Sequence, residues 1–182
     1  MTFPFEPVAL TPTQYELAVK GILDGSGVLL EEFTSNHLDA VKGVDGSYVI
    51  DVTARFTALG ASFLVLIECK HERRKVERQA VQVLHAKMRS TGAQKGMLFS
   101  VAGFQSGAVE YATVHGIALI QMADESSTWF TRSFGPSTPP PGAVDNAQYV
   151  GWWCRGNEFS VVSADEGKYT RRALGIDTPE AH

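Results

Sequence analysis

The 182-residue sequence has few cysteines, no long apolar run and no net basic charge. Its two cysteines, Cys69 and Cys154, are too few for a disulfide framework or a zinc site, which favours a reducing cytoplasm. No apolar run approaches the roughly 18 residues of a membrane span. The N-terminal residues also lack the basic start and apolar stretch of a signal peptide. We therefore expect a cytoplasmic protein with no membrane partner.

The charge of the chain is unevenly distributed. The formal net charge is −4, whereas a phosphate-binding protein usually carries a basic excess. Residues 70–95, however, hold eight basic and two acidic side chains, a local charge of +6 that leaves −10 for the rest. Such a stretch can face a polyanion, and a solvated helix face would explain it equally well.

The hydrophobic pattern predicts an α/β fold. A T-x-x-Q capping box at Thr11–Gln14 starts a helix over 11–24. The other expected elements are strands at 28–33, 48–56 and 63–69, a helix at 76–90, a strand at 97–101, a helix at 107–115 and a strand at 117–121. Residues 34–47, polar and glycine-containing, are expected to form a loop. The order αβββαβαβ is typical of a mixed β-sheet flanked by helices.

A proline-rich linker over 135–146 is expected to separate the main domain, 11–124, from a small C-terminal extension, 147–182. Two strand-like stretches in the extension, YVGWWCRG and EFSVVSA, predict a short β-hairpin. Trp152 and Trp153 could stack on bases, but packing of the hairpin or a homodimer contact is the favoured interpretation.

Three charged residues lie inside or at the end of two consecutive predicted strands. Asp51 interrupts an apolar strand, Y-V-I-D-V-T, and Glu68 and Lys70 end the next one, F-L-V-L-I-E-C-K. The period of two of a strand places Glu68 and Lys70 on one face and Cys69 on the other. Carboxylates suit Mg²⁺, and a lysine can orient or deprotonate a water molecule. Alone, this spacing is common by chance.

The surrounding sequence resembles the Mrr-like branch of the PD-(D/E)xK restriction-endonuclease superfamily. The matching pieces follow in order: Y-E-L-A-V (15–19), G-S-Y-V-I-D-V (46–52), V-L-I-E-C-K (65–70), G-A-Q-K-G-M-L-F-S (92–100), G-F-Q-S-G-A (103–108) and E-Y-A-x-x-x-G-I (110–117). Ile50 departs from the proline that the superfamily name places before the aspartate.

The resemblance implies a restriction-endonuclease-like core and a Mg²⁺-dependent endonuclease that hydrolyses DNA, with Mn²⁺ as a substitute. It implies that Asp51 and Glu68 hold the metal, that Glu16 adds a ligand directly or through water, and that Lys70 serves the attacking water. The products would carry a 5′-phosphate and a 3′-hydroxyl. Three carboxylates, one lysine and one Mg²⁺ would bring the site to zero charge. By analogy, the setting is restriction or defence against foreign or modified DNA.

DNA contacts are expected from the basic stretch and the helix after it, at Arg73, Arg74, Lys75, Arg78 and Gln82. For Gln82, an ordinary surface position is the stronger alternative. Two other functions stay open: a repair or junction-resolving nuclease on the same core, and a DNA-binding module whose catalysis has lapsed. The presence of Asp51, Glu68 and Lys70 together argues against the second.

Overall fold

The computed structural model describes residues 10–27, 30–124, 149–155, 158–163 and 173–174, so the proline-rich segment 135–146 lies outside the described residues. The elements are α1 (Pro12–Gly27), β1 (Glu31–Lys42), β2 (Ser47–Ala58), β3 (Ala61–Lys70), α2 (Arg78–Thr91), β4 (Lys95–Ser100), α3 (Ser106–Val114), β5 (Ala118–Asp124), β6 (Tyr149–Arg155) and β7 (Glu158–Ser163). None of the helices among these residues is long and apolar enough to cross a membrane.

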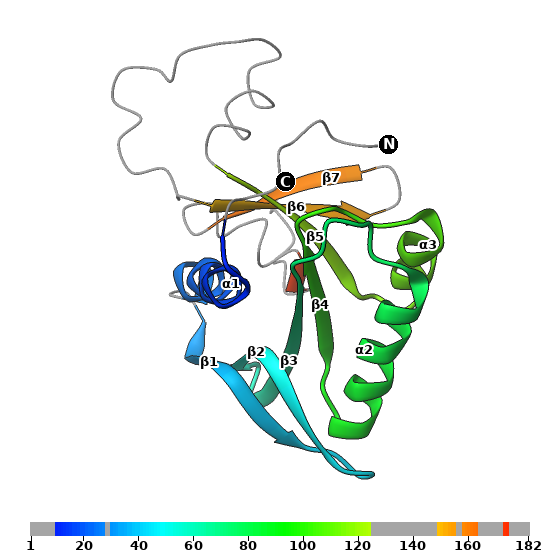
Figure 1. The fold of residues 1–182 in the computed structure, drawn as a ribbon. Helices are drawn as coiled ribbons and strands as arrows, with labels where there is room; N and C mark the ends of the chain where they lie inside the picture. The colour runs from blue at the N-terminus through cyan, green and yellow to red at the C-terminus, as the bar shows by residue number, and fades with distance from the viewer. Residues whose placement is uncertain (1–9, 28–29, 125–148, 156–157, 164–172, 175–182) are drawn as a thin grey trace, which may run out of the picture.

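The described strands form one mixed sheet in sequence order, β1 to β7 (Figure 1). Strands β1, β2 and β3 are antiparallel neighbours, and β3, β4 and β5 run parallel through the crossover helices α2 and α3. Helix α1 lies on one face of the sheet, and α2 and α3 lie on the other. The predicted αβββαβαβ core, a mixed sheet flanked by helices, is confirmed.

Helix α1 begins at the predicted capping box. The Thr11 backbone N–H donates to Gln14 Oε1 (2.9 Å), and the Gln14 N–H donates to Thr11 Oγ1 (3.3 Å). These bonds satisfy two of the backbone donors that a helix start leaves unpaired. The helix then buries Tyr15, Val19 and Leu23 against the sheet, each no more than 1% exposed.

Two apolar clusters form the core, one on each face of the sheet. The α1-side cluster joins α1 to alternate sheet residues such as Ile67 and Phe99. The α2-side cluster joins Leu84 and other residues of α2 and α3 to the intervening sheet residues, including Leu66 and Leu98. The central strands are apolar on both faces because both faces are covered.

Strand β1 corrects the prediction of a loop over 34–47. Residues Glu31–Lys42 form an edge strand paired with β2, although nearly all of them are exposed or half-buried. Ladder hydrogen bonds to β2 hold this strand, so it needs few apolar side chains and gives little hydrophobic pattern to detect. The remaining turn at 43–46 packs against the end of α2, where the Val44 N–H donates to the Ser90 carbonyl (3.0 Å).

The predicted C-terminal hairpin is present and extends the main sheet. Strand β6 pairs antiparallel with β5, and β7 pairs with β6. Trp153 is 9% exposed and belongs to the α1-side cluster, together with Ala173 and Leu174. The extension therefore covers an edge of the sheet and completes its α1 face.

Candidate active site

The end of β3 presents its residues alternately to the two faces of the sheet. Leu66 belongs to the α2-side cluster and Ile67 to the α1-side cluster, and Cys69 packs against the latter. Glu68 and Lys70 share the α2 face, where Lys70 Nζ lies 3.6 Å from Glu68 Oε2. The predicted arrangement of these three side chains is confirmed.

Asp51 lies where β2 changes from one face of the sheet to the other. Ile50 packs in the α2-side cluster, but Val52, two residues later, packs in the α1-side cluster. In a regular strand these residues would share a face. On β1, Leu38 lies between the partners of Ile50 and Val52 and has a left-handed φ of 51°. The register of β1 with β2 is the same on both sides of Leu38, so the change of face occurs without an inserted residue.

The Asp51 carboxylate is fixed to the backbone of β3. The regular pairing of β2 with β3 extends as far as Val52 and Ile67. Beyond this last pair, Asp51 Oδ2 accepts a hydrogen bond from the Cys69 N–H at 2.7 Å. The carboxylate is thus anchored to the backbone of Cys69, the residue between Glu68 and Lys70.

Glu68 lies between two lysines. Lys87 of α2 donates from Nζ to Glu68 Oε1 at 2.6 Å, and Lys70 approaches Oε2 at 3.6 Å. The Glu68 side chain is 10% exposed and that of Lys87 20%. A charged carboxylate at this depth requires paired charges, and the two lysines provide them.

Glu16, the third predicted metal ligand, has a different partner. It lies on α1, and its Oε2 is 2.7 Å from Nε2 of His37 on β1. The part of the chain that the structure describes contains no group of three or more His, Cys, Asp or Glu side chains placed for one metal ion. The carboxylates nevertheless surround Cys69: burial raises the pKa of its thiol well above the usual value, and the charges of Asp51, Glu16 and Glu68 raise it further.

Asp51 and Glu68 fit a hard cation by the chemistry of their donors. Mg²⁺ commonly binds through one or two carboxylates, keeps several waters and also contacts substrate phosphate. Two carboxylates from neighbouring strands, with Lys70 beside Glu68, supply oxygen donors of this kind without Glu16. One oxygen of each carboxylate already accepts a hydrogen bond, from the Cys69 N–H and from Lys87 respectively.

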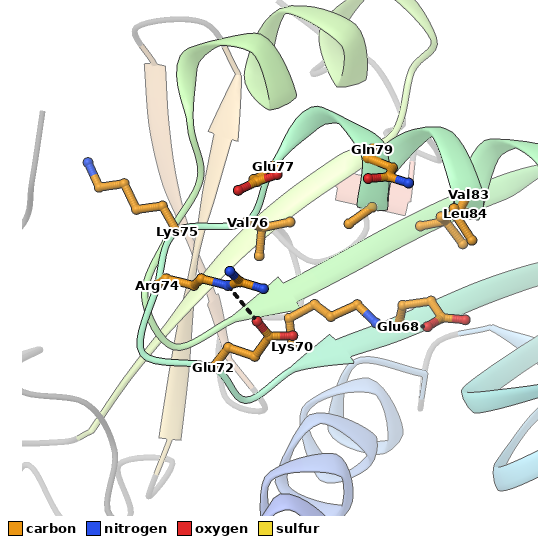
Figure 2. A pocket seen from close by; sticks show the side chains of 11 residues that line it. Glu68, Lys70, Glu72, Arg74, Lys75, Val76, Glu77, Gln79, Val83 and Leu84 are labelled. Carbon is orange, nitrogen blue, oxygen red and sulfur yellow. Dashed lines mark hydrogen bonds and ion pairs between the residues drawn. The ribbon is translucent and has the colours of Figure 1, made fainter.

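A cleft of about 300 Å³ opens on the α2 face beside Glu68 and Lys70 (Figure 2). It lies between the end of β3, the segment that follows and the first turns of α2. Its lining is formed by Glu68, Lys70, Glu72, Arg74, Lys75, Val76, Glu77, Gln79, Ala80, Val83 and Leu84. In Figure 2 the Lys70 ammonium points toward Glu68, and Arg74 reaches toward Glu72, its ion-pair partner at 3.3 Å.

The basic segment after β3 is fixed at both ends. The Lys70 carbonyl accepts from the Val101 N–H (3.3 Å). Val76 donates its N–H to the Gly103 carbonyl (2.9 Å) and accepts from the Gln105 N–H (3.0 Å). Its buried side chain belongs to the α2-side cluster. Residues 71–75 therefore form a short loop between two anchored points, beside the cleft.

The predicted DNA-contacting residues are distributed unevenly around this cleft. Arg74 and Lys75 line it, whereas Arg73, Arg78 and Gln82 are exposed residues that are absent from the lining. The Arg78 guanidinium lies 5.2 Å from the centre of the Tyr111 ring on α3. Gln79, rather than Gln82, is the glutamine at the cleft.

Lys87 is a site residue that sequence reasoning did not assign. It lies three residues after Leu84 on the face of α2 that packs on the sheet. A helix of period 3.6 places residues at this spacing on one side. That spacing was visible in the sequence, but an ion pair 19 residues away in the chain, with Glu68, was not.

The fold and the strand-end site together define a restriction-endonuclease-like α/β protein. The chain belongs to the restriction endonuclease family Mrr_cat, whose model matches residues 8–124. The match covers α1 to β5 and includes Asp51, Glu68 and Lys70.

Two solved structures are similar over part of the chain. A protein of unknown function, AF1548, is 20% identical, with a TM-score of 0.47 over 59% of this chain and 55% of its own. A structure of an EndoMS–dsDNA complex is 22% identical, with a TM-score of 0.40 over 62% of this chain and 45% of that one. This chain thus spans about half the length of each. No curated protein matches the sequence.

Proposed function

We propose that this chain is a Mg²⁺-dependent endonuclease that hydrolyses phosphodiester bonds in DNA. The observation that carries the proposal is the placement of Glu68 and Lys70 in a cleft that Arg74 and Lys75 also line, with Asp51 bonded to the backbone N–H of the intervening Cys69. Membership of the restriction endonuclease family supports the same class of reaction. The nuclease domain would be residues 11–124, with β6 and β7 completing its sheet.

Each group has a defined task in this proposal. Arg74 and Lys75 bind phosphates of the DNA backbone at the cleft, and exposed Arg73 and Arg78 extend the basic surface. Lys70, one-third exposed, orients the attacking water and offsets charge that grows on the phosphate. Asp51 and Glu68 hold the cation. When bound, Mg²⁺ supplies a Lewis acid for the phosphate oxygens.

The test is cleavage of supercoiled plasmid in Mg²⁺, in Mn²⁺ and in EDTA. We expect nicking with either metal and none in EDTA, and we expect Asp51→Asn and Glu68→Gln to abolish it. Glu72→Gln is the matched control because Glu72 lines the same cleft but is exposed and pairs with Arg74. Cleavage in EDTA, or full activity of Glu68→Gln, would contradict the proposed site.

The biological setting that we propose is restriction or defence against foreign or modified DNA. Methylated, unmethylated, branched and mismatched duplexes of one sequence would separate this setting from repair or junction resolution. Selective cutting of the methylated duplex supports defence, and selective cutting of the branched or mismatched duplex supports repair. Salt-sensitive binding without cleavage of any substrate would indicate a lapsed nuclease.

A further inference from the structure

We propose that Lys87 is a resident counter-cation of Glu68, which weakens the binding of divalent cations at the candidate active site. The inference rests on the proposed function, because it takes Glu68 as a cation ligand. Lys87 occupies one lone pair of Glu68 Oε1, and its positive charge opposes a divalent cation bound by either oxygen of that carboxylate. The site would then require a higher concentration of Mg²⁺ or Mn²⁺ than the two carboxylates alone would require.

Lys87 makes the shorter of the two lysine contacts of Glu68. Lys87 Nζ lies 2.6 Å from Oε1, a short, charge-assisted hydrogen bond, whereas Lys70 Nζ is 3.6 Å from Oε2. The stronger of the two interactions of Glu68 is therefore made by the lysine of α2. Leu84 and Met88, on either side of Lys87 in α2, pack in the α2-side cluster and hold the helix at this distance from β3.

The Lys87–Glu68 ion pair is mostly shielded from solvent. The side chains of Lys87 and Glu68 are 20% and 10% exposed. By contrast, Arg74 and Glu72, an ion pair in the lining of the cleft beside Glu68, have side chains that are 81% and 57% exposed. Water screens the exposed pair and leaves it weak, whereas a buried pair interacts at lower effective dielectric. Lys87 is thus a much stronger competitor for a carboxylate than a surface lysine would be.

The charges around Glu68 also affect cation binding. Lys70 and Lys87 carry two positive charges that balance those of Asp51 and Glu68, while Glu16, whose charge also acts at Cys69, pairs with His37. The sequence suggested an excess of negative charge there, because Lys87 was not assigned to the site and Glu16 was. The positive charge of Lys87 therefore opposes a divalent cation at Glu68 unless Lys87 moves away.

The experiment is a calorimetric titration of the DNA-free full chain with Mn²⁺. We expect Lys87→Met to bind Mn²⁺ about tenfold more tightly than wild type, since it removes one unit charge within a few ångströms of the carboxylate. Arg89→Met is the matched control because it removes a positive charge from an exposed position in the last turn of the same helix. Its affinity should stay within about twofold of wild type.

Lys87→Arg keeps the test decisive even if Lys87→Met does not fold. A guanidinium retains the charge and can pair with both carboxylate oxygens, so we expect its Mn²⁺ affinity to equal or fall below that of wild type. Tighter binding by Lys87→Arg, or unchanged binding by a folded Lys87→Met, would overturn the role of Lys87.

Glu68→Gln separates this inference from the proposed function. If Glu68→Gln loses Mn²⁺ binding while Lys87→Met binds as wild type does, the cation site stands and the inference about Lys87 is wrong. If wild type and Glu68→Gln bind Mn²⁺ equally, or neither binds, both the cation site and the inference are overturned.

Discussion

Glu68 and Cys69 are adjacent in the chain but lie in opposite environments on the two faces of the sheet. On the α2 face, Glu68 and Lys70 border a cleft and interact with charged groups. On the α1 face, Cys69 packs against the cluster that contains Tyr15 and Trp153. Alternate residues at the end of β3 therefore have different roles. Those on the α2 face are the candidate catalytic groups, and those on the α1 face pack in the core and hold the strand in place.

The two faces also differ in whether their buried polar groups have partners. On the α2 face, Glu68 pairs with both Lys70 and Lys87. Beneath Cys69, the Tyr15 hydroxyl is fully buried and, among the described residues, has no hydrogen-bond partner. Substitutions on the α2 face should therefore change activity more than stability, and those on the α1 face should do the reverse.

The largest expected effect is the loss of cleavage in Lys70→Ala. Lys70 would act mainly on the transition state, and a positioned acid–base group contributes roughly 10²–10⁴ in rate. DNA affinity should change little. Cys69→Ala is the matched control on the opposite face: its backbone N–H still donates to Asp51, so cleavage should persist while the melting temperature falls. Single-turnover cleavage and binding assays measure both, and near-normal turnover by Lys70→Ala would remove that residue from the mechanism.

The next effect concerns the α1 face and the C-terminal hairpin. Truncation after Gly135 removes Trp153 from the α1-side cluster and leaves the edge of β5 unpaired. Loss of a buried tryptophan alone costs roughly 3–5 kcal/mol, so we expect a large loss of unfolding free energy in urea. Trp153→Phe keeps β6 and most of the apolar packing and should lose much less. A truncated chain as stable as the full one would show that residues 11–124 are sufficient.

A smaller effect tests the basic segment on the α2 face. Changing Arg73, Arg74, Lys75 and Arg78 to Ser should weaken DNA binding. The dependence of log K on log salt concentration should also become shallower, by about 0.9 for each phosphate that is no longer neutralised. The double variant Lys20→Ser with Lys42→Ser removes positive charge from α1 and β1 and serves as the control. Equal salt slopes for all three proteins would mean that the segment is only a solvated surface.

The smallest effect is expected for Tyr15→Phe. Burial raises the pKa of Tyr15 well above 10.0, and the nearby Cys69 raises it further. Removing an unpaired buried hydroxyl should stabilise the protein by about 1 kcal/mol or leave it unchanged at neutral pH. Above pH 10.0 the unfolded tyrosine ionises before the folded one, so wild type loses stability as pH rises. Tyr15→Phe should lose less.

Urea unfolding of both proteins at about pH 8 and about pH 10.5 measures this difference. Lower stability of Tyr15→Phe at the lower pH would show that the hydroxyl has a partner after all.

The sequence by itself determined the elements whose signals are local. The Thr11–Gln14 capping box started α1, the apolar run of β3 indicated a covered central strand, and the period of two placed Glu68 with Lys70 and away from Cys69. The hairpin and the αβββαβαβ order were also predicted, because turns and periodic apolar residues are properties of short segments.

Tertiary structure decided the features that depend on distant partners. Strand β1 is held by β2 rather than by burial, so its exposed residues resembled a loop. The change of face at Asp51 lies between Ile50 and Val52, which pack in different clusters, and Lys87 reaches Glu68 only because α2 packs across β3. Glu16 pairs with His37 because α1 lies against β1. A sequence states which groups are charged and on which side of an element they lie, but which charge meets which depends on how the elements pack.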